Sequence, residues 1–247
     1  MNELEAFRAA AQKKGMPDDA IDWWLRLARP CLYLEKDGSG PVVGHFGGTP
    51  SLPASVVWPD DTVHLASIDL AALPDGALDL GLPSDGTLVF FVEPDMPTYT
   101  GQVIHVPAGA TVAEAEPPSG WDPYDRFPLH ATPNWSLPER PSVTPGYTWG
   151  DRDDEPDYRS IVWSLGDEHD ADEVIVLGGH GLSNTGGLGV PVNEERGEVL
   201  LAEFFLNEEK VGDDFGTDYA TVYYTITRES LAAGRFAEVS LNADFHG

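Results

Sequence analysis

GHFGGTPSLPASVVWP, residues 44–59, joins two adjacent glycines, Gly47 and Gly48, to three prolines. Glycine permits positive φ angles and a close approach of two backbones. Proline fixes φ and pushes the residue before it towards extended conformations. The stretch therefore predicts a rigid, non-helical crossing, and its apolar anchors are Phe46, Leu52 and Trp58.

Regular elements are predicted on both sides of this crossing. Apolar residues at spacings of three and four predict two helices, at 2–14 and at about 18–29, which form a helical hairpin over 1–30. Alternating or continuous apolar runs predict strands, and residues 65–73 open as a strand and close as a helical turn. The other strands are predicted at 31–36, 41–46, 87–92, 102–106, 173–177, 198–206, 220–227 and 236–241, and regular structure is also predicted at 159–165. Thr227 is expected to cap a short helix through Ala233.

Prolines and aromatic residues are concentrated between residues 114 and 158, where neither a helical nor a strand period is found. Disordered linkers are usually poor in aromatic residues. We therefore predict an ordered but irregular excursion that packs on the sheet. A long, structured loop of this kind is often functional.

The two sides of this excursion resemble one another. A double glycine, an apolar strand and an aromatic strand follow in the same order in residues 31–113 and in residues 159–247, where the second double glycine is Gly178 and Gly179. Such a repeat indicates internal duplication. The sequence thus predicts a single α+β domain of two related, mainly antiparallel halves.

Acidic residues outnumber basic ones by 42 to 14, and the net charge is -28. This charge repels phosphate backbones and anionic lipids, so neither nucleic acid nor membrane is an expected partner. Two interpretations of the acidity stay open: a solvated surface tuned for solubility, or an acidic face that steers a basic protein. The second interpretation points to residues 151–157 and 167–173, with the partner-facing acids Asp153, Asp154, Glu168 and Asp170.

A cytoplasmic location is the expectation from cysteine usage and from the N-terminus. Cys31 is the single cysteine, so no internal disulfide can form, which fits a reducing compartment. The chain begins without the basic-then-apolar pattern of a signal peptide. No apolar run approaches the roughly 18 residues of a membrane span.

Several of these segments together resemble the DUF1963, or YwqG-like, family. The similarity covers residues 46–53 with Trp58 and Pro59, residues 65–73 and 82–91, and more loosely residues 177–179, 200–205, 212–216 and 223–226. The resemblance implies an α+β duplicated fold and brings no established activity. Related proteins occur among predicted immunity proteins of bacterial toxin systems.

Two positions depart from the family pattern. Ser67 stands where the family tends to have glutamine, and His180 with the residues after it replaces a proline and a glutamine. If those glutamines line a site, this chain has altered it. The candidate binding residues are accordingly Phe46, Gly47, Gly48, Trp58, Ser67, Asp69, Gly178, Gly179, His180, Asp213 and Asp214.

No catalytic residue can be assigned from a motif. The seven histidines lack metal-ligand spacing, so no metal and no cofactor are predicted. The favoured function is non-catalytic binding, in its most concrete form as an acidic immunity-type partner. The alternative is a hydrolase-like enzyme or a small-ligand-binding protein that uses a groove between the halves.

Overall fold

The computed structural model describes residues 3–94, 100–138, 161, 173–181, 192, 196–212 and 219–246. Its helical elements are α1 (Glu3–Lys13), α2 (Asp18–Leu25), η1 (Leu70–Ala72), α4 (Glu208–Val211), α5 (Arg228–Ala232) and η4 (Phe236–Glu238). Its strands are β1 (Arg29–Glu35), β2 (Val42–Phe46), β3 (Ser51–Pro53), β4 (Val63–Asp69), β5 (Thr87–Val92), β6 (Gly101–Val106), β7 (Val112–Glu114), β8 (Phe127–Ser136), β9 (Glu173–Gly178), β10 (Glu198–Asn207), β11 (Tyr219–Thr227) and β12 (Ser240–His246).

Ten of these strands form one antiparallel sheet in the order β12-β11-β10-β9-β1-β8-β2-β4-β5-β6, while β3 and β7 form a separate ribbon. From each edge inwards the sheet holds four strands in reverse chain order, β6-β5-β4-β2 on one side and β12-β11-β10-β9 on the other. The central strands β1 and β8 join the two sets. The predicted α+β class with a mainly antiparallel sheet is confirmed.

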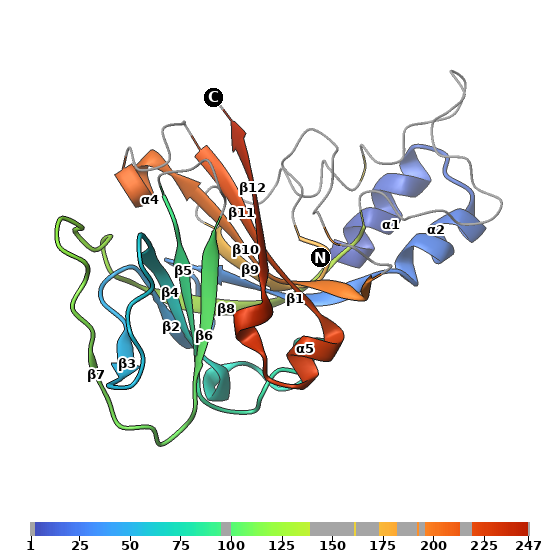
Figure 1. The fold of residues 1–247 in the computed structure, drawn as a ribbon. Helices are drawn as coiled ribbons and strands as arrows, with labels where there is room; N and C mark the ends of the chain where they lie inside the picture. The colour runs from blue at the N-terminus through green and yellow to red at the C-terminus, as the bar shows by residue number, and fades with distance from the viewer. Residues whose placement is uncertain are drawn as a thin grey trace.

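The sheet curls until its two edge strands approach one another, so that it is nearly a barrel (Figure 1). Side chains fill the seam between β6 and β12. A Cβ added to Gly101 would lie 2.2 Å from Leu241 Cδ1, and the His105 and Phe236 rings lie 5.4 Å apart. Glycine at 101 therefore lets the edges come this close.

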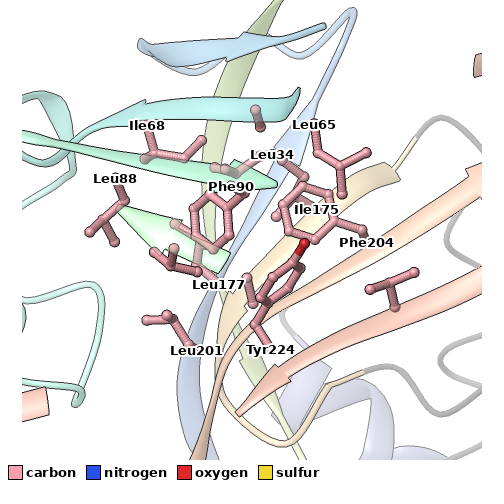
Figure 2. Packing of buried hydrophobic residues seen from close by; sticks show 14 of the residues in the cluster. Leu34, Leu65, Ile68, Leu88, Phe90, Ile175, Leu177, Leu201, Phe204 and Tyr224 are labelled. Carbon is pink, nitrogen blue, oxygen red and sulfur yellow. The ribbon is translucent and has the colours of Figure 1, made fainter. Parts of the chain in front are cut away.

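The inner face of the curled sheet holds the main hydrophobic core, to which both ends of the sheet contribute (Figure 2). Phe90 packs against Phe204 at 5.2 Å and against Tyr224 at 5.3 Å between ring centroids. On β11, Val222, Tyr224 and Ile226 point into this core, as the strand alternation predicts. The helices α1 and α2 bury a smaller cluster of their own around Phe7 and Trp24.

The register of the strands matches at the two ends of the sheet. One row of inward residues is Phe46, Ala66 and Phe90 on β2, β4 and β5, and the other is Leu177, Ala202 and Tyr224 on β9, β10 and β11. The adjacent rows, on the outer face, are His45, Ser67 and Val89 at one end and Val176, Glu203 and Tyr223 at the other. Both β4 and β10 carry a register shift directly before the alanine of the inward row.

The expectation of an irregular excursion over 114–158 is wrong for residues 127–136, which form the central strand β8. The two prolines of this segment argue against a central strand, because proline has no N–H to donate to a neighbouring strand. For this reason β8 is not predicted from the sequence. Pro128 pairs with β2 alone and Pro133 with β1 alone, so each stands where one flank of β8 has no partner strand. The remainder of the excursion, from residue 139, lies outside the described residues.

Other boundaries also differ from those predicted. The second helix ends at Leu25, four residues early, because the chain has already turned into β1 at Arg29. The last predicted strand begins as η4, and β12 starts only at Ser240. Thr227 does cap α5, accepting a hydrogen bond from the Ser230 N–H. The regular structure predicted at 159–165 lies outside the described residues except for Ile161.

Candidate functional site

The double glycine lies where β2 ends and the chain crosses the outer face of β4. Gly47 and Gly48 have φ angles of 60° and 65°, which favour glycine. Their N–H groups donate to the carbonyls of Leu65 at 2.7 Å and Tyr124 at 2.8 Å. A Cβ on Gly47 would lie 2.4 Å from the Asp125 carbonyl oxygen. Only glycine fits this position without displacing a neighbouring backbone.

Two polar side chains of β4 lie beneath the crossing. His64 Nδ1 lies 2.9 Å from the Gly48 carbonyl, and His64 Nε2 lies 2.9 Å from Ser67 Oγ. A carbonyl can only accept, so Nδ1 carries the ring proton and donates it. Nε2 is then the acceptor for the Ser67 hydroxyl. The register shift before Ala66 puts these two residues, three apart in sequence, on one face.

A second histidine and an arginine extend this group. The His45 and His64 rings lie 5.8 Å apart, and Arg126 Nη2 lies 3.4 Å from His45 Nδ1. Burial, followed by the positive charge of Arg126, lowers the pKa of His45 to about 4. Burial is also the largest cause that lowers the pKa of His64 to about 4, against the opposing effect of its hydrogen bond to Gly48. Both rings are therefore neutral at neutral pH.

Chemically, Ser67 and His64 form a hydroxyl–imidazole pair whose imidazole is oriented by a main-chain carbonyl. This is the arrangement of a nucleophile, its base and an orienting acceptor. However, His64 is only 3% exposed and Ser67 only 5% exposed. Phe91 packs on the His64 ring at 5.7 Å, and Trp58 packs on Phe91 at 5.3 Å. The pair is thus closed off from solvent and is placed to hold the crossing onto β4.

Sequence comparison bears on the segment that carries this group. The family model described as "Domain of unknown function (DUF1963)" matches residues 44–117. This segment is similar to DUF1963. The expected resemblance is thereby confirmed over these residues, which run from β2 through β7. No curated protein matches the chain.

The structure brings together only some of the predicted binding residues within the DUF1963 segment. Gly48 and Ser67 both contact His64, and Gly47 shapes the same crossing. Trp58 covers the group through Phe91, and its Nε1 donates to the Thr62 carbonyl at 2.9 Å.

Two predicted residues of this segment lie elsewhere. Phe46 points to the opposite face and is part of the main core. Asp69 is exposed and caps η1, accepting from the Ala71 N–H at 3.0 Å. Neither contacts the histidine group, because strand alternation and the start of η1 direct them away.

Gly178, Gly179 and His180 lie at the end of β9, outside the DUF1963 segment in sequence, although a Cβ on Gly178 would lie 3.0 Å from Leu78 Cδ2 of that segment. A Cβ on Gly179 would lie 2.2 Å from Ser136 Oγ. His180 donates from its N–H to that oxygen at 2.7 Å and from Nε2 to the Leu27 carbonyl at 2.8 Å. Asp213 and Asp214, and the partner-facing acids Asp153, Asp154, Glu168 and Asp170, lie outside the described residues.

Reasoning from the sequence missed His45, His64 and Arg126 as members of the group. For His45, the signal was its place next to the inward-facing Phe46, because neighbouring residues of a strand point to opposite faces of the sheet. His64 is brought onto the face of Ser67 by the register shift in β4, and no pattern in the sequence announces that shift. Within the described residues, no group of three histidine, cysteine or acidic side chains could hold a metal ion. Nor does any described helix have the length and apolarity needed to cross a membrane.

Proposed function

We propose that this chain is a non-catalytic binding protein that docks a basic protein partner through its acidic surface. The observation that carries the proposal is the net charge of -28 on 247 residues. A field of this size speeds the encounter with a basic protein and repels nucleic acid and anionic lipid. The partner is therefore expected to carry a net positive charge.

Within the part of the chain that the structure describes, several exposed carboxylates form no ion pair with another described residue. Ion pairs between described residues use four carboxylates, those of Asp22, Asp79, Glu229 and Glu238. Exposed acids without an ion pair to a described residue are found on several loops, among them Asp37, Asp75, Asp85 and Asp122. Their carboxylates are available to a partner that brings lysine or arginine.

The closed histidine group supports a role without catalysis. A general base must reach its substrate directly or through one water. His64 is buried, and both of its ring nitrogens are hydrogen-bonded, Nδ1 to the Gly48 carbonyl and Nε2 to the Ser67 hydroxyl. Its pKa is about 4. These contacts stabilise the double-glycine crossing, and a binding protein needs a rigid scaffold of this kind.

The most concrete form of the proposal is an immunity-type protein that neutralises a bacterial toxin in the cytoplasm. The toxin would be basic, and the protein would meet it through the acids of residues 151–157 and 167–173. The resemblance to DUF1963 supplies this lead, and the charge supplies the chemistry. Cys31, the single cysteine, is buried and forms no disulfide, which suits a reducing compartment.

The proposal is tested by capturing the partner with two baits from the native host. One bait is the parent chain, and the other carries Asp153→Asn, Asp154→Asn, Glu168→Gln and Asp170→Asn. Mass spectrometry is expected to identify a basic protein that is enriched on the parent bait and depleted on the amide bait. Recovery of the same proteins on both baits, with no excess of basic ones, would contradict the proposal.

A hydrolase is the second candidate function, and the Ser67–His64 pair is the observation that favours it. A serine-reactive fluorophosphonate decides between the two functions. Labelling that disappears in Ser67→Ala and in His64→Gln would establish a reactive serine. We expect no labelling of the folded protein, because both side chains are buried and Phe91 packs on the His64 ring.

We also propose that the two halves arose by internal duplication. The matched strand order, the matched register and the two double glycines support this proposal. At each end of the sheet a strand leads into two glycines with positive φ and then into an antiparallel meander. Superposition of residues 42–106 on residues 173–246 in an experimental structure tests it, and unrelated strand paths would contradict it.

A further inference from the structure

The ribbon of β3 and β7 has an open strand edge, unlike the main sheet. The edge strands β6 and β12 of the main sheet face one another across a seam that side chains fill. In the described part of the chain β7 pairs with β3 alone, and Figure 1 shows it at the outer margin of the molecule. An unpaired edge presents main-chain N–H and C=O groups to which another extended segment can bond.

The pairing with β3 decides which groups of β7 point outwards. The Ala115 N–H donates to the Pro50 carbonyl at 2.9 Å. Hydrogen-bonded and non-hydrogen-bonded pairs alternate along antiparallel strands, so every second residue counted back from Ala115 bonds to β3. Val112 and Glu114 are the residues of the other phase. Their N–H and C=O groups therefore point away from β3.

The free edge of β3 is a poorer template than that of β7. By the same register its outward residues are Ser51 and Pro53, and proline has no N–H to donate. Both outward residues of β7 keep their N–H. Every residue of β7 is exposed, and Val112 is 42% exposed. The edge of the ribbon that another strand can join is thus β7.

The side chains beside this edge set the chemistry of the partner. Residues 49–55 and 107–117 contain both strands of the ribbon, and their only charged side chains are Glu114 and Glu116. Unlike charges directly opposite one another on paired strands stabilise the pair, whereas like charges destabilise it. A basic residue is therefore favoured opposite Glu114. A second copy of this chain would bring its own glutamates to the edge and is disfavoured.

We propose that the outward edge of β7 binds an extended, basic segment of a protein partner by strand addition. The main chain of the segment bonds to Val112 and Glu114. A lysine or arginine of the segment stands opposite Glu114, whose Oε1 accepts from Thr49 and whose Oε2 is left for the partner. An apolar side chain two residues along the segment covers Val112. This edge is separate in sequence from the acids of residues 151–157 and 167–173, and the inference does not rest on them.

The probe is an acetylated and amidated threonine peptide with a central valine and a lysine two residues to either side, which suits both strand directions. A fully N-methylated copy keeps the charge but has no N–H donors, and a copy with glutamates in place of the lysines keeps the donors but reverses the charge. Binding to the full chain is followed by the amide chemical shifts of the isotope-labelled protein. We expect the lysine peptide alone to shift the amides of Val112, Glu114 and their neighbours. Equal shifts from either copy would overturn the proposal.

Matched variants locate the binding. Val112→Pro removes one outward N–H and no bond to β3, and it should weaken binding by about fivefold or more. Val112→Thr keeps the N–H and should bind as the parent does. Glu116→Gln should weaken binding by about twofold at low salt. Asp19→Asn, exposed on α2 at the far side of the molecule, should leave it unchanged (Figure 1).

Three outcomes would contradict strand addition at β7. The first is undiminished binding in a folded Val112→Pro variant; should that variant fail to fold, the N-methylated peptide decides. The second is loss of peptide binding in the variant with amides at Asp153, Asp154, Glu168 and Asp170, which would move the site to those acids. The third is a dimer of the parent in sedimentation that Val112→Pro abolishes, since the occupant would then be a second copy of the chain.

Discussion

Tyr224 Oη donates a 2.7 Å hydrogen bond to the carbonyl of Phe91, joining β11 to β5 across the curled sheet. Tyr224 is fully buried within the core (Figure 2). Tyr224→Phe removes the donor and leaves the carbonyl without this partner. We expect it to lower the free energy of unfolding by about 1–3 kcal/mol, measured by urea denaturation.

Tyr223→Phe is the matched control, because the two tyrosines are adjacent and both are buried. The Tyr223 hydroxyl does not join the two ends of the sheet, since its nearest polar groups are those of Thr221 and Asp244 on β11 and β12. Tyr223→Phe should therefore lower the free energy of unfolding less than Tyr224→Phe does. An equal loss in both variants would show that Tyr224 Oη does not join the two ends of the sheet specifically.

The buried histidine makes stability depend on pH. The pKa of His64 is about 4 in the fold, below its ordinary value of 6.5, so the unfolded chain binds this proton first as the pH falls. Its contribution is full above pH 6.5 and is lost between pH 6.5 and 4, by about 3 kcal/mol. Unfolding free energies measured across this range should fall less steeply in His64→Gln than in the parent.

His45→Gln is the companion variant for this measurement. Its pKa is shifted in the same direction, but His45 is only half-buried, so its removal should flatten the profile less. The comparison between variants cancels the relief of acidic repulsion that every form of the chain gains at low pH. Parallel profiles for the parent and His64→Gln would contradict the burial of a neutral ring.

The double-glycine crossing should be intolerant of any side chain. In Gly47→Ala, the alanine would have to adopt a positive φ. Its Cβ would also lie 2.4 Å from the Asp125 carbonyl oxygen and 2.7 Å from that of Tyr124. We expect a loss of at least about 3 kcal/mol in unfolding free energy. Gly76→Ala also has a positive φ but meets nothing within 4 Å, so it should cost only about 1 kcal/mol. Similar losses at both positions would mean that the crossing can shift.

Strand patterns and turn chemistry predicted much of the fold. The alternation of β11, the capping by Thr227 and the glycine–proline crossing were readable because each depends on local chemistry alone. β8 could not be predicted in this way. Its two prolines are tolerated because β1 and β2 pair with different parts of the strand, so that each proline has a neighbouring strand on one side only. That division is a property of the assembled sheet.

The candidate site was predicted less well for the same reason. Ser67 and Gly48 could be named from the sequence, but their link through His64 depends on the register shift in β4. The open edge of β7 depends on the pairing of β7 with β3, across stretches that are distant in sequence. Strands as short as these carry no periodic signal until they are paired.

The rate at which the chain associates with its captured partner tests the central claim most directly. Three forms are compared: the parent, the variant with amides at Asp153, Asp154, Glu168 and Asp170, and a control with asparagines at Asp37, Asp75, Asp85 and Asp122. The control removes the same number of charges from exposed positions elsewhere. Each rate is measured at about 10 mM and about 1 M salt, where the Debye lengths are about 30 Å and 3 Å.

If the acidity steers a basic partner, the first amide variant should associate about fivefold or more slowly than the parent at low salt. The control should slow far less, and all three rates should converge at high salt. Equal association rates for the parent and the amide variant at low salt would contradict the account, and the acidity would then serve solubility alone.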